Sequence, residues 1–375
     1  MKVAIVTTSR ADYGIFKPLI SALNELKEWE LEIIVTGSHL SLYHGDSYNE
    51  LKEDFPLLKY ELVPALLTSH DPCSVALNYG LVVMRFAEFW KNHLDYNVVF
   101  VLGDRYELAA VVAAGIPFQI SFAHLHGGEV TLGAIDQSYR DFISIVSKWN
   151  FTAEKGSYER VLKLKLPMEN QNVFNVGSLA IDALRSHKDC STEVFYEKTG
   201  LHLNDDFILV TVHPETLDLG GNLINSEIFS KVIEFQVNHS NRNFLVSLPN
   251  TDPASEIWRR MWIRLAKLYS HKIFCVEHLG VKLYYSAMRN CQFMLGNTSS
   301  GIIEAASLRC WVINLGKRQL GRAVSENVIQ CEYDFDSIMS AIDHVLGRKF
   351  RFEGENIYGN GSSAQIIINL LKAQN

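Results

Sequence analysis

The chain has 375 residues, of which 47% are hydrophobic and 21% are charged, and its formal net charge is -7. This length exceeds one comfortable hydrophobic core, so we expect two domains. An acidic balance argues against a nucleic-acid-binding protein, because such proteins usually carry a basic excess. Any anion must therefore be held by a local site.

No targeting or membrane segment is predicted. The first apolar run, Val3 to Val6, is too short for a signal peptide. The longest uncharged stretch, 108–124, is interrupted by Gly115 and Pro117, which favours a buried helix and a buried strand over a membrane span. The sequence therefore predicts a cytoplasmic protein without membrane partners.

Six cysteines are scattered along the chain without a CxxC pair or a metal-ligand spacing. We expect buried, reduced thiols of a cytosolic protein at these positions. They are Cys73, Cys190, Cys275, Cys291, Cys310 and Cys331.

Short β-rich runs alternate with helical stretches in the first half of the chain. The expected strands are 2–7, 31–36, 98–102 and 118–123, and the expected helices are 15–27, 106–114 and 136–148. The pattern then restarts, with expected strands at 207–212, 243–248, 272–276, 291–295 and 310–315.

Nearly continuous apolar strands with helices between them are typical of parallel sheets covered on both faces. We therefore predict an α/β protein with two doubly wound, Rossmann-like domains facing a cleft. The Pro/Asn-rich stretch 166–172 is the candidate linker, which gives domains at 1–172 and 173–356.

The stretch Gly296 to Glu304 follows an apolar run and is expected to open a helix through Leu308. A Gly/Ser-rich turn at a helix start presents backbone N–H groups, hydroxyls and the positive end of the helix dipole, which suits a phosphate. The Glu304 carboxylate can accept hydrogen bonds from two neighbouring sugar hydroxyls. A second turn, Gly316 to Arg322, adds guanidinium groups that match phosphate oxygens. The structural alternative is an ordinary capped βα turn.

Several other polar turns also follow expected strands. In open α/β sheets the carboxyl ends of the strands bind the ligand, so these turns should contribute to one site. Individually each has a structural explanation, such as a helix N-cap. The turns contain Arg10, Asp104 and Arg105, His124 to Glu129, His213 to Thr216, and Glu277 to Gly280.

The chemistry of these residues divides into two sides. Cationic and donor groups suited to a diphosphate are Arg10, His213, Ser299, Ser300, Arg318 and Arg322, with Glu304 suited to a ribose. Acid and base candidates are Asp104, His126, Glu129 and Asp136, since neighbouring carboxylates raise one another's pKa. A GxGxxG fingerprint is missing after the first strand, so nicotinamide chemistry is not supported.

Six motifs in order resemble those of the hydrolysing UDP-N-acetylglucosamine 2-epimerases. They are Ser9 to Gly14, Leu102 to Glu107, His124 to Glu129, Val212 to Thr216, Gly296 to Glu304 and Gly316 to Arg322. The resemblance implies a glycosyltransferase-B-type fold whose C-terminal domain holds the nucleotide. It also implies that the final segment, 357–375, carries a helix that crosses back to the first domain.

The resemblance implies anti elimination of UDP from UDP-N-acetylglucosamine to give a 2-acetamidoglucal. Water then adds, releasing N-acetylmannosamine for sialic-acid-type synthesis. It further implies a homodimer, a small-molecule nucleotide-sugar partner, and no cofactor or metal. Since one epimerase-like unit fills the chain, we expect a bacterial-type monofunctional enzyme.

Residue by residue, the resemblance makes Asp104 an acid/base group, with Glu129 and Asp136 beside it and Arg140 orienting Asp136. His126 stands where animal members of the family carry Glu, and whether His126 or Glu129 transfers the proton stays open. The resemblance places UDP at Arg10, Arg105, His213, Glu277, His278, Leu279, Gly280, Asn297, Ser299, Ser300, Gly301, Glu304, Arg318 and Arg322.

Three alternatives remain at this point. One is a hydrolysing epimerase acting on UDP-N,N'-diacetylbacillosamine in legionaminic-acid synthesis. Another is a non-hydrolysing 2-epimerase, which adds UDP back to the glycal. The last is a glycosyltransferase of the same fold, which needs an acceptor.

Overall fold

The computed structural model describes residues 1–41, 47–66, 71–130, 132, 136–166, 172–215, 220–249 and 254–374. Thr216 and most of the candidate linker 166–172 lie outside these ranges. Two compact units make up the chain: unit 1 is Met1–Ala183 with Tyr358–Asn375, and unit 2 is Leu184–Ile357. Contacts thus divide the chain after residue 183, eleven residues beyond the boundary that composition suggests at 172.

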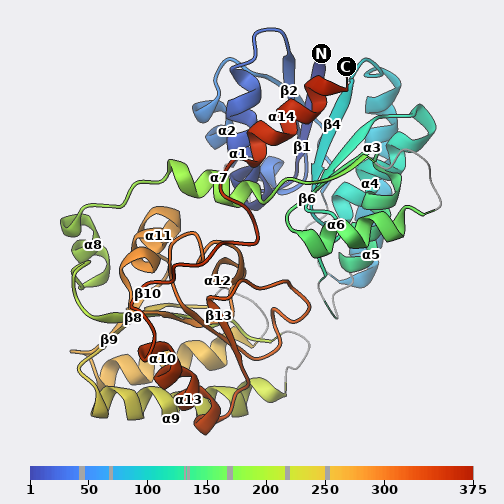
Figure 1. Cartoon of the computed structure of the whole chain (residues 1–375). Helices are drawn as coiled ribbons and strands as arrows, with labels where there is room; N and C mark the ends of the chain where they lie inside the picture. Colours follow the sequence, from blue (N-terminus) through green and yellow to red (C-terminus); the bar gives the residue numbers. More distant parts are fainter. Residues whose placement is uncertain are drawn as a thin grey trace. The chain divides into compact units, whose positions relative to one another are not determined.

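Unit 1 contains a parallel sheet and the helices that flank it (Figure 1). Its elements are β1 (Lys2–Thr7), α1 (Arg10–Asn24), β2 (Glu30–Val35), the 3-10 helix η1 (Gly37–Leu40), α2 (Ser47–Asp54), β3 (Lys59–Leu62), α3 (Pro72–Lys91), β4 (Val98–Leu102), α4 (Tyr106–Gly115), the 3-10 helix η3 (Ile116–Phe118), β5 (Phe122–Leu125), α5 (Asp136–Val146), β6 (Trp149–Thr152), α6 (Lys155–Leu164), β7 (Asn172–Asn175), the start of α7 (Leu179–Ser186) and α14 (Ser363–Ala373).

The seven strands of unit 1 pair in the order β3-β2-β1-β4-β5-β6-β7, and all pairs are parallel. Alternate residues of β1 serve two different cores. Val3 and Ile5 pack with α1 and α14 on one face, whereas Ala4 and Val6 pack with α3 and α4 on the other. A strand that is apolar on both faces explains why its sequence is a continuous hydrophobic run.

One buried charge lies at the amino end of this sheet. Glu32 of β2 has no exposed side-chain surface, and its carboxylate contacts the ammonium groups of Lys2 and Lys59 at 3.2 and 2.8 Å. The hydroxyl of Tyr96 donates a hydrogen bond to the same carboxylate. Burial alone would raise the pKa of Glu32, but these partners outweigh it and lower the pKa to about 2.

Unit 2 repeats the same plan. Its elements are α8 (Thr192–Thr199), β8 (Phe207–Thr211), α9 (Gly221–His239), β9 (Asn243–Ser247), α10 (Ser255–Leu268), β10 (Ile273–Val276), α11 (Gly280–Asn290), β11 (Met294–Gly296), α12 (Ser299–Ile303), β12 (Val312–Leu315), β13 (Val328–Cys331) and α13 (Phe335–Leu346).

The strands of unit 2 pair in the order β10-β9-β8-β11-β12-β13, again all parallel. In each unit the first strand is third in the spatial order of the sheet, and the direction of winding reverses beside it, between β1 and β4 and between β8 and β11. This strand order defines a Rossmann-type sheet, and the reversal is the switch point where such sheets bind ligands. The predicted α/β class with two Rossmann-like domains is confirmed.

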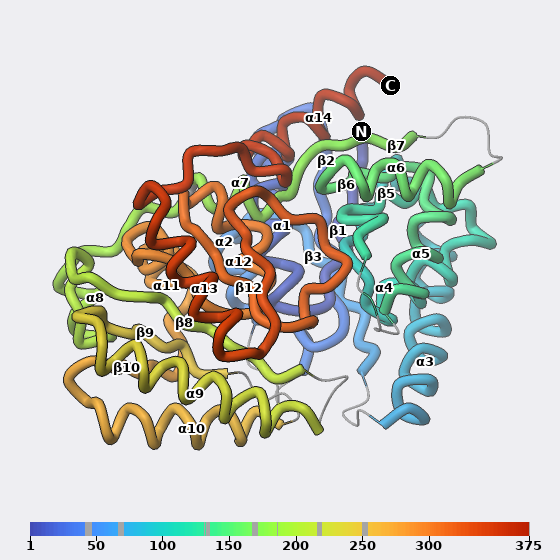
Figure 2. Tube along the Cα trace, turned by 60° about the horizontal axis from the view of Figure 1, so that its bottom comes forward, coloured from blue at the N-terminus to red at the C-terminus, as the bar shows by residue number. Residues whose placement is uncertain are grey.

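The last helix, α14, belongs to unit 1, next to the first helix α1 (Figure 2). Ile367, Ile368 and Leu371 of α14 are buried in the same core as Val3 and Ile5. The Asp182 carboxylate accepts hydrogen bonds from the first backbone N–H groups of α14, those of Ser363 and Ala364, at 3.0 and 2.8 Å. The chain therefore begins and ends in the same unit.

Some expected element bounds were wrong. Helix α1 begins at Arg10 instead of residue 15, because the Asp12 carboxylate accepts from the N–H groups of Thr8 and Ser9 and fixes the first turn. Helix α12 ends at Ile303 instead of continuing to Leu308. The chain closes by a turn in which Arg309 is left-handed, with φ +57°, and the Cys310 N–H donates to the Ala305 carbonyl.

The strand expected at 118–123 is displaced. Residues 116–118 form η3, and β5 occupies Phe122–Leu125, so His124 lies inside the strand. Of the six free cysteines, Cys190, Cys291, Cys310 and Cys331 are buried as expected, whereas Cys73 is exposed and Cys275 is half-buried. No helix in the described ranges is long and apolar enough to cross a membrane.

Candidate active site

The acid and base candidates of unit 1 come from three neighbouring elements. Asp104 follows β4, His126 and Glu129 follow β5, and Arg140 lies on the second turn of α5. Strands β4 and β5 are adjacent and parallel, so their carboxyl ends bring these turns together. We call Asp104, His126, Glu129 and Arg140 the acid–base cluster.

Arg140 joins the cluster. Its guanidinium forms an ion pair with the Asp104 carboxylate through Nη2, and Nη1 donates to the backbone carbonyl of Glu129 at 2.8 Å. The Arg140 side chain is 5% exposed and that of Asp104 is 27% exposed. We expected Arg140 to orient Asp136, but its ion pair is with Asp104. A buried guanidinium with these two contacts holds the β4 and β5 turns at a fixed spacing.

His126 and Glu129 form a second, directly bonded pair. The His126 Nδ1 atom lies 2.8 Å from Oε1 of Glu129, and both side chains are less than 10% exposed. His126 Nε2 lies 3.4 Å from the hydroxyl of Ser178. The His126 backbone is left-handed, with φ +60°, a strained conformation that non-glycine residues adopt at few sites, often functional ones. The imidazole is thus held between a carboxylate and a hydroxyl.

His124 has a different environment from His126. It is fully buried, with Nε2 2.8 Å from the Gly103 carbonyl and Nδ1 3.0 Å from the hydroxyl of Ser144. Burial lowers the pKa of His124 to about 3, so the ring is neutral. A neutral ring with both nitrogens bonded anchors Gly103, the residue before Asp104, and is a support for the cluster.

Asp136 is the first residue of α5 and is exposed. Partial desolvation raises the pKa of Asp136, and the nearby negative charge of Asp104 adds to this shift. Because the side chain is exposed, solvent screening keeps the effect small. Asp136 also lies in the first turn of α5, where its negative charge interacts favourably with the positive end of the helix dipole.

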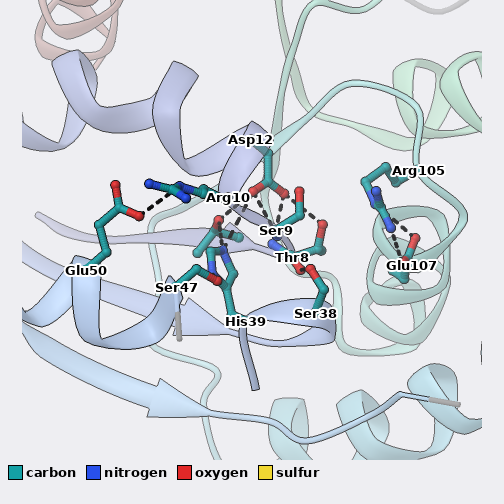
Figure 3. Close-up of polar contacts among 11 residues, drawn as sticks. Thr8, Ser9, Arg10, Asp12, Ser38, His39, Ser47, Glu50, Arg105 and Glu107 are labelled. Atoms are coloured by element: carbon teal, nitrogen blue, oxygen red, sulfur yellow. Dashed lines mark hydrogen bonds and ion pairs between the residues drawn. The ribbon is translucent and has the colours of Figure 1, made fainter. Parts of the chain in front are cut away.

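A buried polar network supports the turn between β1 and α1 (Figure 3). The Asp12 carboxylate accepts from the hydroxyls of Thr7 and Thr8, both at 2.7 Å, and the Thr7 hydroxyl lies 2.9 Å from His39 Nε2. The other His39 nitrogen lies 2.8 Å from the hydroxyl of Ser47 on α2. Burial would raise the pKa of Asp12, but its bonds with His39, Thr7 and Thr8 lower it. Sequence reasoning missed this network because η1 and α2 supply two of its members.

The two arginines of unit 1 that were expected to contact UDP each contact a carboxylate (Figure 3). Arg10, which is 77% exposed, pairs with Glu50 of α2 at 3.0 Å. Arg105 pairs with the buried Glu107 at 2.5 Å. The structure thus pairs each of these guanidinium groups with a carboxylate of unit 1.

Asn297 is the centre of the polar turns in unit 2. Its side chain is fully buried and braces the backbone of His213: Oδ1 accepts from the His213 N–H and Nδ2 donates to the His213 carbonyl, both at 2.8 Å. The Asn297 carbonyl accepts from Arg318 Nη1 at 3.1 Å and from Gln319 Nε2 at 3.0 Å. Asn297 therefore joins the turns after β8, β11 and β12 through its side chain and its backbone carbonyl.

Glu215 adds a second connection between these turns. Its carboxylate accepts from the Lys317 N–H at 2.6 Å. Gly316 precedes Lys317 with φ +65°, and a Cβ atom at this glycine would lie 2.1 Å from the Glu215 carboxylate. Only glycine fits here, which explains the Gly that opens the motif from residue 316.

Hydroxyl groups gather at the start of α12. The Ser300 hydroxyl lies 2.8 Å from that of Thr298 and 3.0 Å from the phenol oxygen of Tyr284 on α11. The Thr298 hydroxyl also accepts from the N–H of Gly301 as the N-cap. Tyr284 was missed from the sequence, since nothing in the spacing of α11 marks a residue that contacts Ser300. With five residues, α12 contributes little dipole, so the donors here are hydroxyls and backbone N–H groups.

The turn from Glu277 to Gly280, which was expected to contact UDP, is only partly organised by side chains. Leu279 is buried and Gly280 is left-handed with φ +65°, whereas Glu277 and His278 are exposed. The Glu277 carboxylate pairs with Arg259 of α10. The remaining expected UDP contacts, Ser299, Glu304 and Arg322, lie on α12, at its C-cap and in the turn after β12.

Both groups of residues follow the strands at a switch point. In unit 1 they follow β1, β4 and β5, and in unit 2 they follow β8, β11 and β12. This is the ligand-binding edge of a doubly wound sheet. Within the described ranges no cluster of three His, Cys, Asp or Glu residues could hold a metal ion.

Comparison with known proteins agrees with this picture. Residues 21–372 match the family model of the UDP-N-acetylglucosamine 2-epimerases. A UDP-N,N'-diacetylbacillosamine 2-epimerase (hydrolyzing) of Legionella pneumophila is 30% identical over 373 residues, 99% of this chain and 95% of the relative. The Escherichia coli polysialic acid biosynthesis protein P7 is 32% identical over 352 residues, 93% of this chain and 87% of the relative.

Solved structures agree on the fold. A UDP-GlcNAc 2-epimerase from Methanocaldococcus jannaschii superposes with a TM-score of 0.78 at 18% identity, with both chains fully covered. The enzyme from Neisseria meningitidis, solved with UDP-GlcNAc, gives a TM-score of 0.77 at 17% identity, also with full coverage of both chains. The fold is therefore of the glycosyltransferase-B type. The chain belongs to the UDP-N-acetylglucosamine 2-epimerase family, so the resemblance predicted from the motifs is confirmed.

Proposed function

We propose that the protein is a hydrolysing 2-epimerase that acts on a UDP-2-acetamido sugar, with UDP-N-acetylglucosamine as the substrate. The observation that carries this proposal is the acid–base cluster, in which Arg140 joins Asp104 to the turn that holds the His126–Glu129 pair. A glycosyltransferase of the same fold has no need for two sets of proton-transfer groups.

The reaction begins with anti elimination. The C1–O bond of the sugar breaks, UDP leaves with the bonding electrons, and the proton on C2 is removed to give a 2-acetamidoglucal. Water then adds its hydroxyl at C1. C2 takes a proton on the face opposite to the one that lost its proton, which inverts C2 and gives N-acetylmannosamine. We assign the two proton transfers at C2 to Asp104 and to the His126–Glu129 pair.

The C1–O bond must break before the C2 proton is removed, or as it is removed, because this proton is not acidic. Stabilisation of the leaving diphosphate is therefore the largest contribution expected. In unit 2 the candidates are His213, Ser299, Ser300 and Arg318, and removal of one such donor costs on the order of 3 kcal/mol in comparable sites. Arg10 of unit 1 is proposed to add a further charge, and Glu304 to accept from the ribose hydroxyls.

A second substrate has specific support. Hydrolysing 2-epimerases of Legionella pneumophila and Campylobacter jejuni that are named for UDP- or GDP/UDP-N,N'-diacetylbacillosamine are each 30% identical to this chain. We therefore keep UDP-N,N'-diacetylbacillosamine as the alternative substrate. It differs from N-acetylglucosamine at C4 and C6 of the sugar and requires the same elimination.

Incubation of the purified protein with each UDP-sugar alone, in deuterated water, tests the proposal. We expect free UDP together with a product that carries deuterium at C2 and the inverted configuration there. A product that remains linked to UDP would indicate the non-hydrolysing reaction. Release of UDP only after addition of an acceptor would indicate a glycosyltransferase.

Variants separate binding from chemistry. Ser300→Ala and Glu304→Gln should weaken UDP binding measured by calorimetry. Asp104→Asn and Glu129→Gln should leave UDP binding nearly unchanged and abolish product formation, since these groups act on the sugar. If Asp104→Asn lost UDP binding as well, our assignment of the two sides would be wrong.

We also propose that the enzyme is cytoplasmic and homodimeric. A nucleotide-sugar substrate and the free thiols support the cytoplasmic location. A role in sialic-acid-type sugar synthesis follows from the proposed product and is supported by the name of the Escherichia coli relative.

A further inference from the structure

A tyrosine outside the predicted motifs lies beside the polar turn at the start of α12. The phenol oxygen of Tyr284, on α11, is 3.0 Å from the hydroxyl oxygen of Ser300 and 3.4 Å from that of Thr298. The ring of Tyr284 packs against a buried core of unit 2 that contains Leu279 and Met294. Because the ring is held by this core, the phenol oxygen keeps its place next to Ser300.

Ser300 has two hydroxyl neighbours and only one proton to donate. Its oxygen lies 2.8 Å from the Thr298 hydroxyl as well as 3.0 Å from the Tyr284 hydroxyl. A serine hydroxyl can accept two hydrogen bonds through its lone pairs but can donate only one. Ser300 therefore either donates to one of these neighbours or accepts from both. Only the second arrangement leaves its proton for another group.

The Thr298 hydroxyl already accepts a hydrogen bond. It receives the backbone N–H of Gly301 at 3.3 Å as the N-cap of α12, and its own proton can be donated to Ser300. These bonds set one direction along the turn, in which Gly301 donates to Thr298 and Thr298 donates to Ser300. A single donor fills only one of the two lone-pair positions of Ser300.

Tyr284 supplies the second donor. Burial raises the pKa of its phenol beyond the opposing effect of the neighbouring hydroxyls, so Tyr284 keeps its proton at neutral pH. With Thr298 and Tyr284 both donating, the lone pairs of Ser300 are filled and its proton points away from both. Tyr284→Phe would keep the ring but leave one lone pair of Ser300 open, which would let the Ser300 hydroxyl turn toward other acceptors.

The Ser300 proton that remains is suited to an anion. A hydrogen bond to an ionised oxygen is roughly twice as strong as one between neutral groups. Donors in series also polarise one another, so two hydroxyls that donate to Ser300 make its own proton a better donor. Ionised diphosphate oxygens only accept hydrogen bonds, so they match a site whose remaining group is a donor.

We infer that Tyr284 is a positioning residue of the nucleotide site: its phenol donates to Ser300 and directs the Ser300 proton toward an anionic oxygen of the diphosphate. This inference rests on the proposed function, which places the diphosphate of UDP at Ser300. In this role Tyr284 acts only through Ser300. The loss of its hydroxyl should therefore matter only while the Ser300 hydroxyl is present.

A double-mutant cycle measured by calorimetric titration with UDP tests this role. Tyr284→Phe should raise the dissociation constant for UDP about three- to tenfold, the range expected for one net hydrogen bond. Ser300→Ala should raise it by at least as much, and the double variant should match Ser300→Ala alone, since the effect of Tyr284 passes through Ser300. Independent losses that multiply in the double variant, or an unchanged dissociation constant for Tyr284→Phe, would overturn the inference.

Tyr269→Phe is the matched control. Tyr269 is a partly buried tyrosine of unit 2 that packs against the other core of this unit, so its change removes one phenolic hydroxyl elsewhere and should leave UDP binding unchanged. Tyr284→Phe should melt at nearly the temperature of this control, because its ring stays in place. A UDP affinity that is lost only together with the folded state would contradict a positioning role.

The cycle separates this inference from the proposed function, because it needs UDP binding but no turnover. If the unmodified protein binds UDP and converts neither UDP-sugar, the proposed function fails and the cycle still decides the role of Tyr284. If the protein converts a UDP-sugar and the two changes act independently, only the role of Tyr284 fails. An unmodified protein that does not bind UDP would refute both.

Discussion

The brace formed by Asn297 gives the sharpest prediction about the nucleotide side. Asn297→Ala removes the two hydrogen bonds of 2.8 Å that hold the N–H and carbonyl of His213. His213 is 8% exposed, so water reaches its backbone poorly. A buried group left without its partner costs about 1–3 kcal/mol, so we expect a loss of roughly 2–4 kcal/mol in the folding free energy of unit 2.

The same change should weaken UDP binding. The Asn297 carbonyl also accepts hydrogen bonds from the side chains of Arg318 and Gln319. A displacement of the backbone at residue 297 would therefore move the donor groups of two turns. A shift of a few tenths of an ångström lengthens several hydrogen bonds at once. We expect the dissociation constant for UDP to rise at least tenfold, which corresponds to about 1.4 kcal/mol.

Calorimetric titration with UDP and urea denaturation measure these two effects. Ser299→Ala, at an exposed position of α12, is the control for stability and should unfold at nearly the urea concentration of the unmodified protein. Asn297→Asp retains the acceptor for the His213 N–H but sets a buried carboxylate against the His213 carbonyl, so it should be at least as unstable as Asn297→Ala. If Asn297→Ala kept both its stability and its UDP affinity, the bracing role would be refuted.

Three further predictions concern unit 1. The pKa of Glu32 is about 2, below its usual value near 4.5. Ionised Glu32 therefore stabilises the fold above pH 4.5 by on the order of 3 kcal/mol, and this stabilisation is lost as the pH falls toward 2. Glu32→Gln should therefore flatten the acid limb of a plot of unfolding free energy against pH, and an unchanged limb would contradict the assignment. The pKa of His124 is about 3 in the folded protein and about 6.5 in the unfolded chain. Below pH 6.5 the unfolded chain therefore binds a proton that the folded protein does not, and the unfolding free energy falls as the pH decreases toward 3. Its ring signals in nuclear magnetic resonance should stay constant between pH 5 and 8, and an inflection near 6.5 would refute a neutral support. Gly128→Ala should lower the unfolding free energy by roughly 2–4 kcal/mol, because Gly128 has φ +80° and a Cβ atom would lie 2.3 Å from the Ser157 carbonyl. Gly14→Ala, where a Cβ atom meets no neighbour within 4 Å, is its control, and equal melting temperatures for the two variants would contradict the clash.

The sequence was most informative where one local pattern decides the structure. Continuous apolar runs located β1, β4 and β8 to within a residue, because a strand buried on both faces has few polar positions. The runs for β3, β6, β7 and β13 were not recognised. These strands are only four residues long, and three of them, β3, β7 and β13, lie at the edges of their sheets and are only partly buried.

The candidate site was predictable as a set of turns but not as a set of contacts. The motifs contained Asp104 and Glu129, since polar residues after parallel strands indicate a site, and the family resemblance added Arg140. The pairing of Arg140 with Asp104 joins residues 36 apart in sequence, so spacing alone does not reveal it. His39, Ser178 and Tyr284 were missed for the same reason, because each is recognised only by what it contacts.

The two-segment composition of unit 1 has a consequence for biosynthesis. Residues 184–357, the whole of unit 2, leave the ribosome before α14, whose Ile367, Ile368 and Leu371 complete the core around Val3 and Ile5. Domains usually fold as they emerge. Unit 2 can therefore fold while unit 1, although translated first, still exposes the apolar groove that α14 fills. During synthesis the core of unit 1 is therefore completed only after the eleven residues of α14 have been translated.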